Sequence, residues 1–167
     1  MMKRKGLAVL GLLMVPAMLA AQSSPGIVLF NEGKFAEAAQ ALQVQVREQP
    51  GNVEALTYLG LARVHSGNAE GALAPLNQAV AKNEANTRAR YARGLAYTKL
   101  GNLDDAVIDL KEATTLDPNH AYAHYHLGMT FNKQGNKGPA ILHLRRFVEL
   151  APDAPEAKAV RSFLSRI

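Results

Sequence analysis

The chain has 167 residues, of which 48% are hydrophobic and 20% charged, a formal net charge of +5 and no cysteine. The absence of cysteine excludes disulfide scaffolds, thiolate zinc fingers, iron–sulfur sites, cysteine nucleophiles and lipid attachment through a cysteine. The balance of apolar and charged residues indicates a globular chain rather than a disordered one.

The first 21 residues have the layout of a secretory signal peptide. Basic residues at positions 3–5 precede an apolar run over residues 6–21, and the sequence turns polar at Gln22. The run is shorter than the ~20 residues that a membrane-spanning helix needs. We expect residues 1–21 to direct export to a periplasm or out of the cell, and a retained N-terminal membrane anchor is the alternative. The candidate cleavage sites follow Ala20, Ala21 and Ser23.

Removal of this segment changes the meaning of the net charge. Positions 3–5 hold three of the nineteen basic side chains, so their loss leaves sixteen against fourteen acidic ones. A difference of two charges gives no argument for a nucleic-acid partner, which would need a basic stripe along the surface.

Small and apolar residues recur every 34 residues in the rest of the chain. At an average glycine usage of about 7%, a column of four glycines at one fixed spacing is rare by chance. A repeat of this period indicates one structural unit that is copied four times. The columns are Gly26, Gly60, Gly94 and Gly128; Gly33, Gly67, Gly101 and Gly135; Ala38, Ala72, Ala106 and Ala140; and Leu42, Leu76, Leu110 and Leu144.

Each unit has the pattern of two helices joined by a turn. Within residues 87–120, small and apolar residues recur at helical spacing on both sides of Gly101. Glycine at the turn supplies the left-handed conformation that ends the first helix. Small residues inside the helices predict that the two helices of a unit cross closely. Asparagine is expected to cap the second helices, at Asn68, Asn102 and Asn136.

A 34-residue helix–turn–helix unit with these columns resembles the tetratricopeptide repeat family. The resemblance implies an all-α solenoid in which the first helix is short and starts at Ser24 and Pro25, with serine as its cap. The family has an aromatic residue at one position of the first helix of each unit. This position holds Tyr97 and Phe131 in the last two units but Arg63 in the unit before them. The units cover residues 25–154, as an incomplete first unit at 25–52 followed by 53–86, 87–120 and 121–154.

Two features depart from a uniform repeat. Pro75 lies inside the second helix of the unit at 53–86, so we expect a kink opposite the carbonyl of Gly71. Residues 155–167 are expected to form a capping helix that begins at Pro155 and covers the apolar end of the last unit. Phe147, where interior units hold alanine, is expected to pack beside Phe163.

The resemblance places the first helix of each unit on the inner face of a curved array. Tyrosine, methionine and leucine side chains on this face suit a surface that binds polypeptide. The alternative is that some of them are buried between neighbouring helices. The candidate peptide-binding residues are Leu61, Arg88, Tyr91, Leu95, Lys99, Tyr122, Tyr125, Met129 and Asn132.

The helix expected near residues 87–100 concentrates positive charge. By their positions in the repeat, Arg88 and Lys99 lie on the inner face of the array, where they suit an acidic segment or a terminal carboxylate of a ligand. Arg90 and Arg93 occupy positions that are usually apolar in the repeat. We expect these two arginines to reach solvent or to pair with a neighbouring carboxylate, the candidates being Asp104, Asp105 and Asp109.

His120, His124 and His126 raise the question of a metal site, because residues four apart share a helical face. A site would need a third converging ligand, and His126 points about 200° around the helix from His124. Surface or interhelical hydrogen bonds are the preferred interpretation, and we expect neither a metal site nor a cofactor.

The sequence contains no nucleophile–base signature, phosphate-binding loop or metalloprotease motif. The leading hypothesis is therefore an exported, non-catalytic adaptor that binds a protein or peptide segment, with an acidic segment as one option. The first alternative is a self-associating component of a cell-envelope assembly, because apolar residues 27–30 follow the expected cleavage site. The second alternative is a histidine-based metal binder.

Overall fold

The computed structural model describes residues 24–166, and these residues form nine helices and no strand. The predicted all-α solenoid is confirmed. The signal peptide expected at residues 1–21, like Ile167 at the end of the expected capping helix, lies outside the described residues. The helices are α1 (Pro25–Asn31), α2 (Phe35–Glu48), α3 (Val53–His65), α4 (Ala69–Lys82), α5 (Thr87–Leu100), α6 (Leu103–Leu116), α7 (Ala121–Lys133), α8 (Lys137–Leu150) and α9 (Ala157–Leu164).

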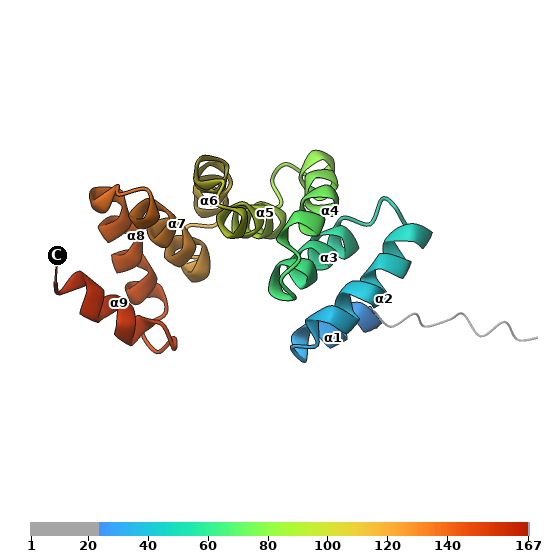
Figure 1. Ribbon diagram of the computed structural model, residues 1–167, viewed down its shortest axis with the longest axis horizontal. Coiled ribbons are helices and arrows are strands. Elements are labelled where there is room, and N and C mark those ends of the chain that lie inside the picture. The colour runs from blue at the N-terminus through green and yellow to red at the C-terminus, as the bar shows by residue number, and fades with distance from the viewer. Residues whose placement is uncertain (1–23, 167) are drawn as a thin grey trace, which may run out of the picture.

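Consecutive helices pair into hairpins, and the hairpins stack side by side in an arch (Figure 1). Within each hairpin the first helix contacts the second, and the second contacts the first helix of the next hairpin. The first helices also contact one another, α1 with α3, α3 with α5 and α5 with α7. They therefore form the inner layer of the arch, and α9 packs on α8 at its C-terminal end.

The repeated glycines are positions where two helices cross with no room for a side chain. A Cβ atom at Gly60 would lie 2.3 Å from Cγ of Leu76, and one at Gly94 would lie 2.7 Å from Cγ of Leu110. Both leucines are fully buried. The glycine and leucine columns thus encode one contact, repeated in every hairpin, in which the leucine of the second helix fills the space above the glycine of the first.

The turns between the helices of a hairpin follow the second glycine column, and Gly101 has a φ of 83°. The capping pattern differs from the prediction. Asn68 accepts a hydrogen bond from the Gly71 amide, but Asn102 and Asn136 make no side-chain cap. The caps that recur every 34 residues instead start the first helices: Asn52, Asn86 and His120 accept bonds from Ala55, Ala89 and Ala123.

Helix α4 runs from Ala69 to Lys82 without interruption, although Pro75 lies inside it. Proline has no N–H to donate to the carbonyl of Gly71, four residues earlier. The Arg63 guanidinium of α3 donates to that carbonyl at 2.7 Å. A side chain from the partner helix therefore replaces the missing backbone donor.

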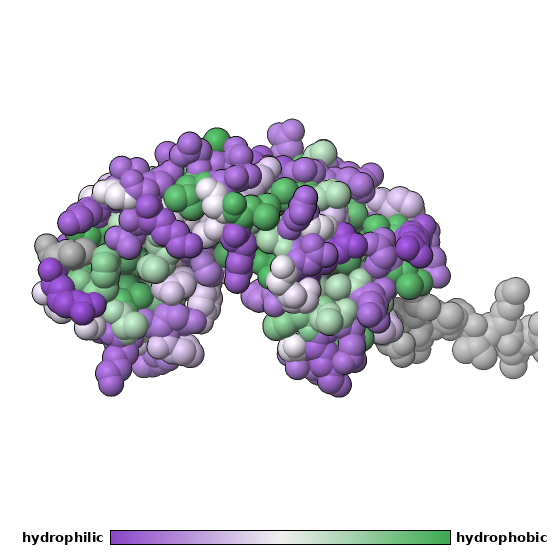
Figure 2. All heavy atoms as spheres, viewed as in Figure 1, coloured by the Kyte–Doolittle hydropathy of each residue, from purple (hydrophilic) through white to green (hydrophobic). Residues whose placement is uncertain are grey.

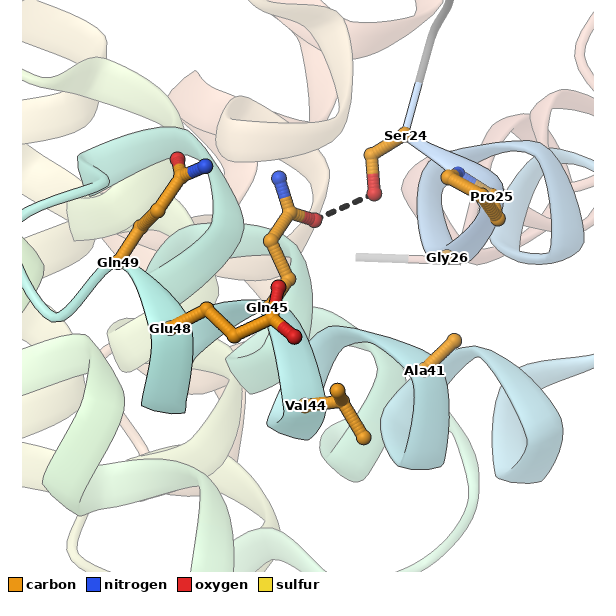
Figure 3. Close-up of a pocket in the computed structure, with 8 residues that line it drawn as sticks. All are labelled: Ser24, Pro25, Gly26, Ala41, Val44, Gln45, Glu48 and Gln49. Atoms are coloured by element: carbon orange, nitrogen blue, oxygen red, sulfur yellow. Dashed lines mark hydrogen bonds between the residues drawn. The ribbon is translucent and has the colours of Figure 1, made fainter.

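The two ends of the array differ from its middle. Pro25 is the first residue of α1, as predicted, but the Ser24 hydroxyl donates to the Gln45 side chain instead of capping α1 (Figure 3). At the other end, α9 begins at Ala157 and not at Pro155. Phe147 is fully buried in one cluster with Phe163, as predicted. None of the helices in residues 24–166 is long and apolar enough to cross a membrane.

Candidate peptide-binding groove

The inner layer of first helices borders a hollow in the molecule. Figure 2 shows the arch as a surface that is open on the side where α7 and α3 face one another, with α5 between them. Side chains from α5, α7 and α9 line two adjoining pockets of this surface.

The first of these, the central pocket, lies between α5 and α7 and has a volume of about 260 Å³. Leucine, tyrosine and methionine form its apolar part, and one lysine at the C-terminal end of each helix borders it. Lysine at a helix C-terminus also interacts favourably with the helix dipole. The residues that define the pocket are Leu95, Lys99, Tyr125, His126, Met129 and Lys133.

The second, the cap pocket, lies between α7 and α9 and has a volume of about 190 Å³. It shares Tyr125 and Met129 with the central pocket, so the two form one continuous surface. Its polar wall includes Glu156, whose carboxylate accepts a hydrogen bond of 3.1 Å from the Tyr122 hydroxyl. The residues that define it are Tyr125, Met129, Asn132, Glu156, Val160 and Phe163.

Aromatic rings connect the groove surface to the core beneath it. The Tyr91 ring lies 4.7 Å from that of His120 and 5.8 Å from that of His126. The Tyr125 ring lies 5.0 Å from that of Phe147, which is fully buried. Contacts of this kind hold the tyrosines in fixed orientations, which reduces the entropy lost when a ligand binds.

The pKa values of the histidine and tyrosine side chains near the groove are set mainly by burial. Burial lowers the pKa of His126 to about 4, against a raising effect of Glu156 and with smaller lowering effects of His65 and Lys99. Burial also raises the pKa of Tyr91 and Tyr125. At neutral pH the imidazole and both phenols are therefore neutral, and the formal charges at this surface belong to the lysines and to Glu156.

The predicted groove residues occupy different environments. Leu61 is only 5% exposed and belongs to the core between α3, α4 and α5, so it contributes packing rather than surface. Leu95 is equally buried but lines the central pocket. Tyr91, Tyr125, Met129 and Asn132 are half-buried, whereas Tyr122 and Lys99 are exposed. The two pockets bring together Leu95, Lys99, Tyr125, Met129 and Asn132.

Arg88 lies apart from the two pockets. Its guanidinium stands over the Tyr58 ring, 5.2 Å from the ring centre, beside a separate hollow that Glu54 and Asn86 also line. Contact of this type between a cation and an aromatic face is favourable by about 0.5–1 kcal/mol at an exposed site. Arg88 and Lys99, at opposite ends of α5, therefore serve different parts of the surface.

The cap pocket contains residues that the 34-residue repeat pattern did not predict. Glu156, Val160 and Phe163 lie in or next to α9, beyond the last repeat unit, so no repeat position indicated a role for them. The only sequence signal was the amphipathic pattern of the capping helix itself, which predicted burial and not a pocket.

Arg90 and Arg93 do pair with a carboxylate, and the partner is Asp109 of α6. Arg93 binds it with two atoms, Nε to Oδ2 at 2.6 Å and Nη2 to Oδ1 at 2.8 Å, while Nη1 of Arg90 lies 3.4 Å from Oδ1. The Asp109 side chain is only 2% exposed. These arginines therefore stabilise the α5–α6 hairpin and do not contribute charge to the groove.

Two histidines of the fourth unit, one on α7 and one on α8, form a hydrogen-bonded pair. His124 and His143 approach with their Nδ1 atoms 3.0 Å apart, and Nε2 of His124 lies 3.1 Å from the carbonyl oxygen of Pro118. A carbonyl only accepts, so Nε2 of His124 carries a proton, and its Nδ1 then accepts from Nδ1 of His143. Within residues 24–166, no three His, Cys, Asp or Glu side chains gather in a group that could hold a metal ion.

A third pocket lies at the N-terminal end of the described array, between the start of α1 and the outer side of α2 (Figure 3). Its volume is about 500 Å³. Ser24, Ala41, Val44 and Glu48 are among its lining residues, and Val44 is 53% exposed. No hairpin precedes α1 among the described residues.

The chain is similar to solved structures that include those of MamA and YrrB. A MamA structure has a TM-score of 0.72 at 24% identity and covers 85% of this chain and 83% of its own. MamA from Desulfovibrio magneticus RS-1, from residue 41 to its end, has a TM-score of 0.68 at 27% identity, with 78% and 73% covered. YrrB, a TPR protein with an unusual peptide-binding site, has a TM-score of 0.70 at 28% identity, with 82% and 71% covered.

Sequence comparison gives the family. No curated protein matches the chain. Three family models do: a TPR repeat over residues 94–135, and tetratricopeptide repeats over 26–87 and 122–154. Together they span the four hairpins, in agreement with the 34-residue period and with the glycine–leucine contact of each unit. The chain belongs to the tetratricopeptide repeat family.

Proposed function

We propose that the chain is an exported, non-catalytic adaptor that binds a segment of a partner protein in the groove formed by α5, α7 and α9. The observation that carries this proposal is the continuous surface of the central and cap pockets, in which fixed aromatic and aliphatic side chains lie between ionic groups. Such a surface gains affinity from apolar burial and orientation from its charges.

The family and the structural relatives support this function at a coarser level. The tetratricopeptide fold is generally a protein-interaction module, and YrrB has a peptide-binding site. A scaffold by itself does not name its ligand, so the groove residues of this chain have to carry the argument.

The groove proposal is tested by the paired substitution of Tyr125→Ala and Met129→Ala, because both residues line both pockets. Captured partner should be lost from the variant, while circular dichroism shows that it remains folded. A matched control replaces two exposed apolar residues of the second helices, Ile108→Ala and Leu142→Ala, and should retain capture. Equal capture by the folded groove variant would overturn the proposal.

Export rests on residues 1–21, whose basic start, apolar run and small residues fit a signal peptide. Mass spectrometry of the N-terminal peptide from native cells tests it. A first residue at position 21, 22 or 24, in a periplasmic or secreted fraction, supports export with cleavage. An intact N-terminus in a membrane fraction supports the anchored alternative instead.

Self-association is a second candidate, because α1 and α2 expose apolar side chains at the N-terminal end of the described array. Val28 is 42% exposed on α1, and Val44 borders the end pocket on α2. A second copy placed there would cover Val28, whose equivalents Ala62 and Ala96 are buried inside the array. Light scattering of residues 22–167 tests this candidate: a dimer that Val44→Glu dissociates supports it, and a monomer at high concentration contradicts it.

A further inference from the structure

The two adjoining pockets of the groove are bordered by groups of opposite charge. Lys99 and Lys133 border the central pocket, and Glu156 borders the cap pocket, with Tyr125 and Met129 shared between them. Within residues 24–166 neither lysine forms an ion pair with a carboxylate. Both ammonium groups are exposed and therefore available to an incoming anion.

The size of the pockets indicates what kind of group fits them. Sites for drug-sized ligands usually enclose about 300–1,000 Å³. The cap pocket, at about 190 Å³, is smaller and has the apolar side chains of Leu144, Val160 and Phe163 in its wall. This volume and lining suit one apolar side chain of a longer chain better than a complete small molecule.

Glu156 determines which end of such a ligand carries its negative charge. The Tyr122 hydroxyl holds the carboxylate in place at 3.1 Å. An acidic group at the cap pocket would meet this fixed negative charge, whereas at the central pocket it would meet two ammonium groups and the neutral imidazole of His126. Like charges brought together in an interface disfavour the wrong register of a ligand.

We propose that the partner segment places an apolar side chain in the cap pocket and a carboxylate between Lys99 and Lys133. The inference rests on the proposed function, because it names the chemistry of the segment that the groove binds. The apolar group supplies affinity through burial, and the carboxylate fixes the register. The carboxylate belongs to an acidic side chain of the segment, and a free C-terminus is the other source that the test distinguishes.

The test is a selection of random twelve-residue peptides on the mature protein and on two variants. Lys99→Gln with Lys133→Gln removes both positive charges from the central pocket. Ala159→Phe fills the cap pocket from α9, since Ala159 is exposed and lines it. Lys158→Phe is the matched control, because it adds the same ring to the neighbouring exposed position, which does not line the pocket. Unchanged thermal melting shows that each variant is folded.

The selected sequences decide the inference. The mature protein should enrich an apolar residue at a fixed spacing from an acidic residue or a free C-terminus. The lysine variant should lose the acidic preference, with binding of the best peptide weakened about fivefold to tenfold, as expected for two exposed charges. Ala159→Phe should lose the apolar preference, and Lys158→Phe should keep both. Synthetic peptides with a free or an amidated C-terminus then show which carboxylate is used.

Two failures are distinguishable. If the mature protein enriches no peptide, the groove function itself is wrong. If it enriches peptides that lack the apolar–acidic pair, or whose enrichment neither variant changes, the inference about charge and register is overturned while peptide binding stands.

Discussion

Arg63 of α3 donates a hydrogen bond of 2.7 Å to the carbonyl oxygen of Gly71 in α4. In an uninterrupted helix the amide of residue 75 would be the donor, but this residue is proline. The other guanidinium nitrogen, Nη2, donates to the side chain of Gln43 in α2. Arg63 stands where the later units hold Tyr97 and Phe131, so two departures from the repeat pattern form one interaction that compensates for proline.

We predict that Arg63 and Pro75 are energetically coupled. Arg63→Met should lower the free energy of unfolding by about 1 kcal/mol, near the low end for a lost acceptor partner, because the Gly71 carbonyl is only partly buried. In a Pro75→Ala background the backbone amide returns, so the same substitution should cost less than half as much. Urea unfolding of the four proteins measures the coupling. Equal costs in both backgrounds would show that the two residues act independently.

The repeated glycine–leucine contact leads to a second prediction. Gly60→Ala should destabilise the chain by about 1–3 kcal/mol, because the new Cβ would lie 2.3 Å from Leu76 and force the two helices apart. Gly138 is the control: it lies in the first turn of α8, and apart from its chain neighbours a Cβ there meets no atom within 4 Å. The gain in helix propensity from Gly138→Ala is offset by the clash of its Cβ with the ring of the following Pro139, so stability should change by less than about 1 kcal/mol. Thermal unfolding of both variants checks the difference.

Loss of the buried carboxylate in the third hairpin should be costly. Asp109→Asn leaves Arg90 and Arg93 without their negative partner, and we expect a loss of about 2 kcal/mol in the free energy of unfolding. The guanidinium groups are partly exposed, which keeps the cost below that of a fully buried pair. Asp153→Asn, at an exposed position, should change stability by less than about 0.5 kcal/mol. Similar urea midpoints for the two variants would contradict a structural role of Asp109.

Acid should destabilise the fourth unit through its histidine pair. Burial, His124 and Lys111 together lower the pKa of His143 to about 4, and burial lowers the pKa of His124. As pH falls from about 6.5 towards 4, the unfolded chain binds protons that the folded chain does not, so stability decreases over this range. Urea unfolding at pH 7, 6 and 5 should show the decrease, with a shallower one in His143→Gln. A decrease of the same steepness in that variant would assign it to other groups.

The sequence predicted the repeat and its helices well, because steric requirements there act between residues at fixed spacing. Glycine is needed wherever a leucine of the second helix crosses the first, and four hairpins repeat that requirement. The caps were predicted less well: asparagine occurs at the start of both helices, and only packing decides that Asn52 and Asn86 accept hydrogen bonds while Asn102 does not.

Most side-chain contacts between helices could not be predicted from the sequence. The sequence left three carboxylates as candidate partners of Arg93, and it did not predict a partner for His124. Both pairings depend on how one helix is rotated against the next, which the repeat pattern does not specify. The cap pocket was not predicted, because α9 lies beyond the last repeat unit. Of the three tyrosines chosen by their repeat positions, Tyr125 lines both pockets and the other two line neither, and the burial of Leu61 became visible only in the packed structure.

The most direct test of the groove places a photo-crosslinking phenylalanine analogue at Met129, which both pockets share, and at the exposed Leu142 of α8 as the control. After irradiation of native cells, we predict an adduct with another polypeptide at Met129 and none at Leu142. Adducts confined to Leu142, or equal at both positions, would contradict the claim that the chain binds its partner through the groove.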